Sequence, residues 1–154
     1  MSTHTAIIRW QCDDDNFADN KYSRGHVWEF DGGAVVAASA APDVVPLPMS
    51  VAENVDPEEA FVASLSSCHM LFFLSFAASR GFNIDEYVDE AIGEMQKDEQ
   101  GLTSMTKVTL RPRIVWSGEK QPTSEQKDKL HHKAHKYCFI ANSVKTAIVI
   151  EAVS

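Results

Sequence analysis

The sequence predicts an α+β protein in which helices pack against an antiparallel β-sheet. Residues 5–12 and 22–30 alternate apolar with polar side chains and are rich in β-forming residues. Residues 56–80 form a long apolar run with helix start and stop signals, and residues 146–153 form a strongly apolar final strand. A chain of 154 residues, 44% of them hydrophobic, suffices for one core, so we expect a single domain over residues 1–154.

The N-terminal strands are expected to form a β-meander. The sequence Asp31-Gly32-Gly33 follows the second strand and is typical of a hairpin turn, which predicts a third strand over residues 34–40. A long loop is expected over residues 41–55, because prolines exclude a regular strand or helix interior. This segment contains three of them: Pro42, Pro46 and Pro48.

The segment after this loop carries the clearest helix signals. Asp56 can cap the helix, Pro57 suits its first position, and Glu59 lies three residues after the cap. Gly81 is a matching stop signal. The residues between are apolar on nearly every side, which is typical of a buried helix. We therefore expect a long buried central helix.

The second half of the chain is expected to combine two more helices with strands. An apolar face that includes Tyr87 predicts a short helix over residues 85–91. Thr123 and Gln126 match a capping box, which predicts a third helix ending near residue 137. The segments between these helices are expected to form a strand starting at 94–97, a turn at 98–101 and a strand over 102–116 with Pro112 at an edge or bulge.

The composition argues against two kinds of partner. The formal net charge is −8, which disfavours nucleic acid, because binding a phosphate backbone needs a basic face. The apolar stretch near residues 71–78 is shorter than the roughly 20 residues that span a bilayer. The first residues lack a secretory signal, and the three cysteines fit a reducing compartment. We expect a cytoplasmic protein with no nucleic-acid or membrane partner.

Two cysteine segments carry a resemblance to a known family. Residues 54–68, Asn-Val-Asp-Pro-Glu-Glu-Ala-Phe-Val-Ala-Ser-Leu-Ser-Ser-Cys, resemble the first cysteine motif of the OsmC/Ohr family: Asn/Asp-Pro-Glu-Glu/Gln-Leu, a small-residue run and a cysteine. Residues 134–145 resemble its second cysteine motif, and Arg24-Gly25-His26-Val27 is similar to its early Arg-Gly element. The neighbours of both cysteines differ from the usual pattern, which indicates a divergent OsmC-like branch.

The resemblance implies a thiol-dependent peroxidase that reduces organic hydroperoxides on an OsmC-like fold. It implies an intertwined homodimer with active sites at the subunit interface, and no metal or organic cofactor. Carried over by position, Cys68 is the peroxidatic thiolate and Cys138 the resolving thiol, while Arg24 and Glu58 form the polar pair around the reacting sulfur. An external dithiol would reduce the resulting disulfide.

Thiol chemistry gives these four residues a physical reason. Only the thiolate attacks peroxide, and a free cysteine with a pKa of about 8.5 is mostly protonated near neutral pH. Cys68 lies beyond the first helical turn, where the helix dipole acts, so it needs a cation such as Arg24. Glu58 precedes Cys68 by ten residues, about 15 Å along one helix. We therefore expect Glu58 to serve the partner subunit's site, with the two helices crossing near Ala63 and Ser64.

Several residues also have plainer interpretations. Cys12 is expected to be structural, and Arg24 alone is compatible with a surface charge. His69 points about 100° away from Cys68 around the helix, so no direct role is expected. An apolar rim around the site would favour alkyl or lipid hydroperoxides over hydrogen peroxide. We expect three phenylalanines to form this rim: Phe61, Phe72 and Phe139.

Two other classes of function remain open. His131, His132 and His135 include a pair four residues apart, the spacing of a two-histidine metal site. Lysines lie among them, which favours an exposed polar face over a histidine-helix metal protein. The main alternative to a peroxidase is a non-enzymatic protein on the same dimeric fold, which binds hydrophobic ligands or serves a stress response.

Overall fold

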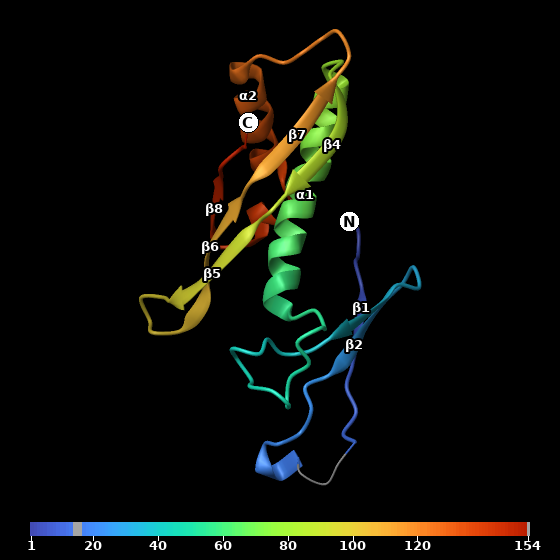
Figure 1. The fold of residues 1–154 in the computed structure, drawn as a ribbon, viewed down its shortest axis with the longest axis vertical. Helices are drawn as coiled ribbons and strands as arrows, with labels where there is room; N and C mark the ends of the chain where they lie inside the picture. The colour runs from blue at the N-terminus through green and yellow to red at the C-terminus, as the bar shows by residue number, and fades with distance from the viewer. Residues whose placement is uncertain (14–16, 154) are drawn as a thin grey trace. The chain divides into compact units, whose positions relative to one another are not determined.

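The structure, a computed structural model, describes residues 1–13 and 17–153. It has the mixed helix and strand content of the predicted α+β class (Figure 1). The chain divides into two compact units, Met1–Ala60 and Phe61–Ser154, each with its own β-strand pairing. The expectation of a single domain over residues 1–154 stays a prediction.

The first unit contains the predicted β-meander. Its three strands pair antiparallel in the order β1-β2-β3, with Trp28 of the central strand opposite Ile8 on one side and Val36 on the other. Gly33 has a φ of 92°, which only glycine adopts readily, so the turn into the third strand depends on it. The strand bounds are β1 Ala6–Arg9, β2 His26–Phe30 and β3 Val35–Ala38.

The proline-containing segment after β3 is a loop, as predicted. Its backbone is held by isolated backbone hydrogen bonds and by side chains rather than by a regular ladder. Ser39 Oγ accepts a hydrogen bond from the Val51 backbone at 2.9 Å, and Asn54 Nδ2 donates to the Ala38 carbonyl at 3.1 Å. Ser39 is fully buried, so these bonds satisfy polar groups that would otherwise be costly inside the unit.

The long helix α1, Pro57–Ser79, begins and ends where the sequence predicts. Asp56 and Glu59 form a reciprocal cap: the Glu59 backbone donates to Asp56 Oδ1 at 2.8 Å, and the Asp56 backbone donates to Glu59 Oε2 at 3.2 Å. Gly81 follows the helix with a φ of 78°, the left-handed conformation of a helix stop.

Within the single chain, α1 is buried along one stripe rather than on all sides. The buried residues fall four apart, at Leu65, His69, Phe73 and Ala77. The helix is also long and apolar enough, by length and composition, to cross a bilayer, a test that the core helix of a soluble protein passes as well. The residues on the exposed side, which we call the α1 strip, are Ala63, Ser67, Leu71, Ser75 and Ala78.

The strands of the second unit form two separate sheets. One sheet is an antiparallel pair, and the other contains a parallel pair, which the prediction of an antiparallel sheet did not include. The segment expected as one strand over residues 102–116 is two strands, because the chain passes from one sheet to the other at Pro112. The pairs are β4 Asn83–Asp89 with β7 Pro112–Ser117, and β5 Ile92–Lys97 with β6 Thr103–Leu110 and β8 Ala147–Ile150.

The helix predicted over residues 85–91 is wrong, because this segment forms β4 and the chain after it. The register of β4 against β7 shifts between Ile84 and Glu86, which makes Asp85 the extra residue of a β-bulge. The bulge brings Ile84 and Tyr87 to the same core cluster although they are three residues apart. A bulged strand therefore has the apolar spacing of a helical turn.

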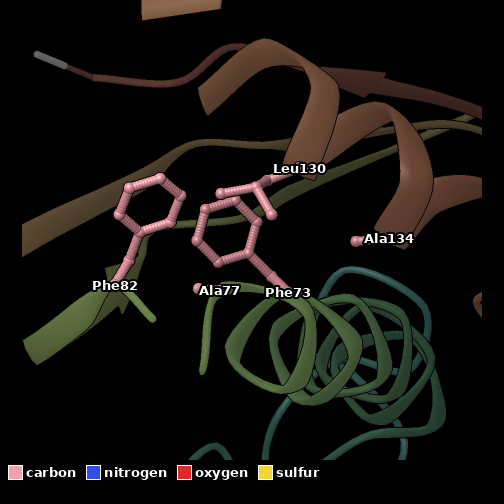
Figure 2. Close-up of a cluster of buried hydrophobic side chains, with 5 residues drawn as sticks. All are labelled: Phe73, Ala77, Phe82, Leu130 and Ala134. Carbon is pink, nitrogen blue, oxygen red and sulfur yellow. The ribbon is translucent and has the colours of Figure 1, made fainter. Parts of the chain in front are cut away.

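A cluster of buried side chains joins α1 to α2, Ser124–Tyr137 (Figure 2). Phe73 of α1 is fully buried and lies 5.9 Å, between ring centres, from Trp116 of β7. The predicted capping box starts α2, because Thr123 and Gln126 each accept a hydrogen bond from the other's backbone. The other members of the cluster are Ala77, Phe82, Leu130 and Ala134.

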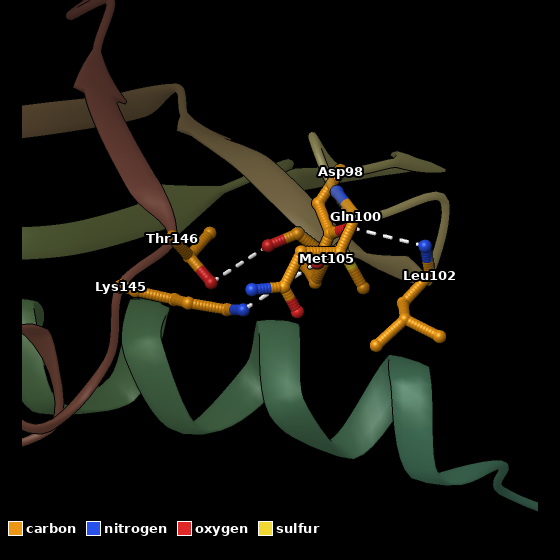
Figure 3. Close-up of polar contacts among 6 residues, drawn as sticks. All are labelled: Asp98, Gln100, Leu102, Met105, Lys145 and Thr146. Carbon is orange, nitrogen blue, oxygen red and sulfur yellow. Dashed lines mark hydrogen bonds and ion pairs between the residues drawn. The ribbon is translucent and has the colours of Figure 1, made fainter.

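The β5–β6 turn and the entry to β8 are held by polar contacts (Figure 3). Asp98 Oδ1 accepts hydrogen bonds from the backbone of Gln100 at 2.8 Å and of Leu102 at 3.0 Å. Thr146 Oγ1 donates to the Met105 carbonyl at 2.8 Å, which connects the start of β8 to β6. These contacts place the end of the second cysteine segment beside the central strand of its sheet.

Candidate thiol site

The structure brings Cys68 and Cys138 together, although they lie 70 residues apart in the sequence. Cys68 is half-buried on α1, and Cys138 is 1% exposed at the C-terminal end of α2. Both thiols are free, and they lie close enough for Cys68 to influence the titration of Cys138. Burial, with a smaller contribution from neighbouring Cys68, raises the pKa of Cys138 to about 11.

The buried Cys138 is held by backbone contacts on both sides. Its N–H donates to the Ala134 carbonyl at 2.9 Å, which continues the hydrogen bonding of α2. The Ala141 N–H donates to the Cys138 sulfur at 3.4 Å, from the short 3₁₀ helix η2, Ala141–Ser143. The position of this sulfur is therefore set by the end of α2 and the turn after it.

Two of the three predicted rim phenylalanines contact each other. Phe72 of α1 and Phe139 meet edge to face with ring centres 4.9 Å apart. Phe139 follows Cys138 and is 71% exposed, so an apolar surface lies next to the thiol pair. Phe61 belongs instead to a second core cluster with Leu65.

Arg24 lies in the loop before β2, where its guanidinium binds nearby residues of the first unit. Its Nη1 donates to the carbonyls of Tyr22 at 2.5 Å and Asn20 at 3.2 Å, and its Nη2 donates to Asn20 Oδ1 at 2.7 Å. The guanidinium carbon also lies 3.6 Å from the centre of the Tyr22 ring. In this conformation Arg24 is bound to Asn20 and Tyr22 and forms no ion pair with Glu58.

Glu58, in the first turn of α1, has a buried carboxylate oxygen. Among the residues that the structure describes, its Oε2 has no hydrogen-bond partner. Burial raises the pKa of Glu58, and the carboxylates of Asp56 and Asp43 add to the shift. A buried carboxylate oxygen without a hydrogen-bond partner is unfavourable, so this oxygen has capacity for a cationic partner.

The sequence did not predict a buried histidine pair that joins α1 and α2. His69 is 1% exposed and His131 is 6% exposed, and their Nε2 and Nδ1 atoms lie 3.1 Å apart. Burial lowers the pKa of each to about 4, so both rings are neutral near pH 7. The exposed polar face expected for His131 is therefore wrong, whereas His132 is exposed.

A sequence signal for this pair existed. His69 occupies the buried stripe of α1, four residues from Leu65 and four from Phe73. His131 precedes Ala134 and Cys138 at spacings of three and seven, which place it on their face of α2. In the described part of the chain, no group of three or more His, Cys, Asp or Glu side chains is arranged to hold a metal ion.

A pocket of about 300 Å³ lies between β7 and the first turns of α2, and His131 forms part of its wall. Trp116 contributes an aromatic wall, and Lys127 and Asp128 contribute opposite charges. The pocket therefore connects one ring of the buried histidine pair to a polar surface.

Comparison with known proteins agrees with this fold. The family model described as OsmC-like protein matches residues 51–153. The solved structure of an OsmC-like protein of unknown function from Vibrio cholerae is 56% identical in sequence, with a TM-score of 0.97 over 99% of this chain and 100% of that chain. No curated protein sequence matches this chain.

More distant solved structures share the fold alone. An organic hydroperoxide resistance protein from Elizabethkingia anophelis is 18% identical, with a TM-score of 0.71 over 99% of this chain and 94% of that chain. The corresponding protein from Bacillus subtilis is 18% identical, with a TM-score of 0.70 over 99% of this chain and 98% of that chain. From the family model and the Vibrio relative together, the chain belongs to the OsmC-like protein family, within the OsmC/Ohr group that its two cysteine motifs indicated.

Proposed function

We propose that this protein is a thiol-dependent peroxidase that reduces organic hydroperoxides. The observation that carries the proposal is the proximity of the two thiols, since Cys68 lies near enough to contribute to the raised pKa of Cys138. Two thiols that lie close together in a fold can form a disulfide when their geometry allows it. Structural neighbours named as organic hydroperoxide resistance proteins agree with this assignment.

The proposed reaction has two steps on the protein. The Cys68 thiolate attacks a peroxide oxygen, the O–O bond breaks, and Cys68 is oxidised to a sulfenic acid while the alkoxide takes a proton and leaves as an alcohol. The Cys138 sulfur then attacks the Cys68 sulfur and the S–O bond breaks. The thiol proton leaves with the hydroxyl group as water, and an external dithiol reduces the disulfide by exchange.

The environments of the two thiols support this division of roles. Cys68 is the more exposed of the two and is therefore the one accessible to peroxide. Cys138 is almost fully buried, and its pKa of about 11 keeps it protonated near pH 7, so it does not compete for the peroxide. The exposed Phe139 beside it favours substrates with alkyl or lipid chains.

We assign Arg24 and Glu58 to the activation of Cys68. Only a thiolate reacts, so a guanidinium near the sulfur would favour the reactive form. The unpaired Glu58 oxygen can accept hydrogen bonds from Arg24 when that side chain leaves Asn20. Glu58 and Cys68 lie ten residues apart on α1, about 15 Å along the axis, so Glu58 acts at the Cys68 of a partner subunit.

A homodimer follows from the same proposal. The α1 strip is lined by small residues around Leu71, which is 61% exposed, and small residues allow two helices to approach closely. An apolar helix face left uncovered within one chain is typical of an interface between copies. We place this dimer in the cytoplasm, where dithiol reductants are present. The proposed reaction uses no resident cofactor.

The test of the peroxidase proposal is a turnover assay. Wild-type protein is mixed with cumene hydroperoxide or tert-butyl hydroperoxide and a dithiol reductant. We expect wild type to consume peroxide over many turnovers, Cys68→Ser to be inactive, and Cys138→Ser to lose dithiol-driven turnover while still forming a sulfenic acid. Cys12→Ser is the matched control and should retain the wild-type rate.

Three results would contradict the assignment. No consumption by the wild type would favour the alternative of a hydrophobic-ligand-binding or stress-response protein on the same fold. Normal turnover by Cys138→Ser would remove the resolving role from Cys138, and a preference for hydrogen peroxide over alkyl hydroperoxides would contradict the apolar rim.

A further inference from the structure

We propose that His69 and His131 are a positioning pair, whose hydrogen bond sets the approach of Cys68 to Cys138 and thereby the reduction potential of the thiol pair. The inference rests on the proposed use of this thiol pair as a reversible disulfide. Neither histidine is needed to contact substrate, and each acts through the helix that carries it.

The geometry between the two imidazoles is that of a directional hydrogen bond. Nε2 of His69 and Nδ1 of His131 lie 3.1 Å apart, the ring centres are 5.4 Å apart, and the ring planes differ by 7°. The distance between the ring centres equals, to a close approximation, the distance between the two nitrogens plus one ring radius on each side. Both nitrogens therefore lie on the line that joins the ring centres. The rings therefore lie end to end in nearly one plane, as a linear N–H···N bond requires.

Each histidine is rigidly connected to one cysteine. His69 follows Cys68 directly on α1. His131 lies seven residues, or two helical turns, before Cys138, and the Cys138 N–H still donates to the Ala134 carbonyl of α2. A shift of one helix along the other would therefore move the two sulfurs and the two ring nitrogens by similar amounts.

The surroundings of the pair make this hydrogen bond hard to replace. Phe73 is fully buried and its ring centre lies 4.2 Å from that of His131, so an apolar wall covers the pair on that side. Separating the rings would leave Nε2 of His69 and Nδ1 of His131 without this hydrogen bond inside the core, which is unfavourable. Apolar contacts alone are not directional, so they hold the helices together without selecting one relative position.

The consequence is a link between helix position and the thiol–disulfide equilibrium. Disulfide bonds tolerate a narrow range of geometry, and misplaced sulfurs make the bond easier to reduce. Removing the histidine hydrogen bond should therefore destabilise the disulfide relative to the dithiol, even when the protein stays folded.

The experiment measures the equilibrium between dithiol and disulfide in buffers of reduced and oxidised dithiothreitol at pH 7.5. His69→Leu, which leaves His131 unpaired, is expected to lower the equilibrium constant for the disulfide about tenfold, or about 30 mV for this two-electron couple. His69→Gln, whose amide can replace the ring Nε2, should stay within about twofold of wild type. His132→Ala, an exposed histidine on α2, is the matched control and should change nothing.

A folded His69→Leu variant with the wild-type constant would overturn the proposal, as would equal losses in His69→Leu and His69→Gln. If neither variant folds, the test moves to wild-type protein with ¹⁵N-labelled histidine. Closing the disulfide should then shift the ring nitrogen signals of His69 and His131 and leave those of His132 in place. Unchanged signals for the pair would also overturn it.

This test is separate from the peroxidase assay because it uses no peroxide. A protein that forms the disulfide in oxidised dithiothreitol but consumes no hydroperoxide would fail the proposed function and leave the positioning pair standing. Wild-type protein that forms no disulfide between Cys68 and Cys138 would remove the basis of the inference itself.

Discussion

Burial shifts the pKa values of buried histidines and of a buried carboxyl group of this protein in opposite directions. It lowers the pKa of His69 and His131 to about 4 and raises that of Glu58, because in each case it disfavours the charged form. The sequence located Glu58 by its motif, but it identified neither buried histidine. A histidine next to lysines on a helix looks exposed until the orientation of that helix is known.

The histidine pair predicts a specific dependence of stability on pH. Each histidine has a pKa of 6.5 when unfolded and about 4 when folded, so the unfolded chain binds more protons between these values. The contribution of the two neutral histidines to the free energy of unfolding is therefore complete above pH 6.5, and it is lost as the pH falls toward 4. From pH 7.5 to 5, we expect the free energy of unfolding to fall by about 2 kcal/mol for each histidine.

Urea unfolding at the two pH values measures this loss. The charged groups near the pair act on it in both directions: His135 opposes protonation of His69, whereas Asp128 and Asp89 favour protonation of His131. A double variant, His69→Gln with His131→Asn, should show a smaller loss, and His132→Ala should keep the full loss. The same loss in the double variant would assign it to other groups.

At the scale of elements, local signals predicted helix ends well and sheet partners poorly. The caps of α1 and α2 depend on residues within four positions of each other, so the sequence displays them directly. The bulge at Asp85 and the change of sheet at Pro112 depend on pairing with distant strands. This is why β4 resembles a helix in the sequence and why β6 and β7 resemble one strand.

Gly93 of β5 offers a test of element packing. A Cβ at this position would lie 2.5 Å from Val62 Cγ2 of α1 and 2.6 Å from Met105 Sδ of β6. We expect Gly93→Ala to lower the free energy of unfolding by about 1–3 kcal/mol, because overpacking forces the helix and sheet apart. Gly32→Ala is the control, since nothing lies within 4 Å of its Cβ position. Equal stability of the two variants would contradict this packing.

At the scale of the whole molecule, the proposed homodimer depends on the uncovered side of α1. The helix is apolar around its circumference but is buried along one stripe within the chain. The sequence predicted a fully buried helix from its composition. In the structure the stripe that faces the core is buried and the α1 strip is exposed, which supports a second copy as the cover of the strip.

Two leucines of equal exposure test the interface. Leu71 of the α1 strip and Leu102 of the β5–β6 turn are each 61% exposed. By sedimentation velocity, we expect wild type and Leu102→Lys to be dimeric and Leu71→Lys to be monomeric, because a buried unpaired lysine is unfavourable. Leu71→Lys should also lose peroxidase turnover. A monomeric wild type, or dissociation by Leu102→Lys, would contradict the proposed interface.

The sequence by itself determined the α+β class, the helix ends and the family, because caps, turns and cysteine motifs are written in residues close along the chain. Only the tertiary structure decided that β6 pairs in parallel with β8, that residues 83–89 form a strand, and that His69 meets His131. These features depend on which distant segments pack together, and that choice follows from the burial of the whole chain rather than from any local pattern.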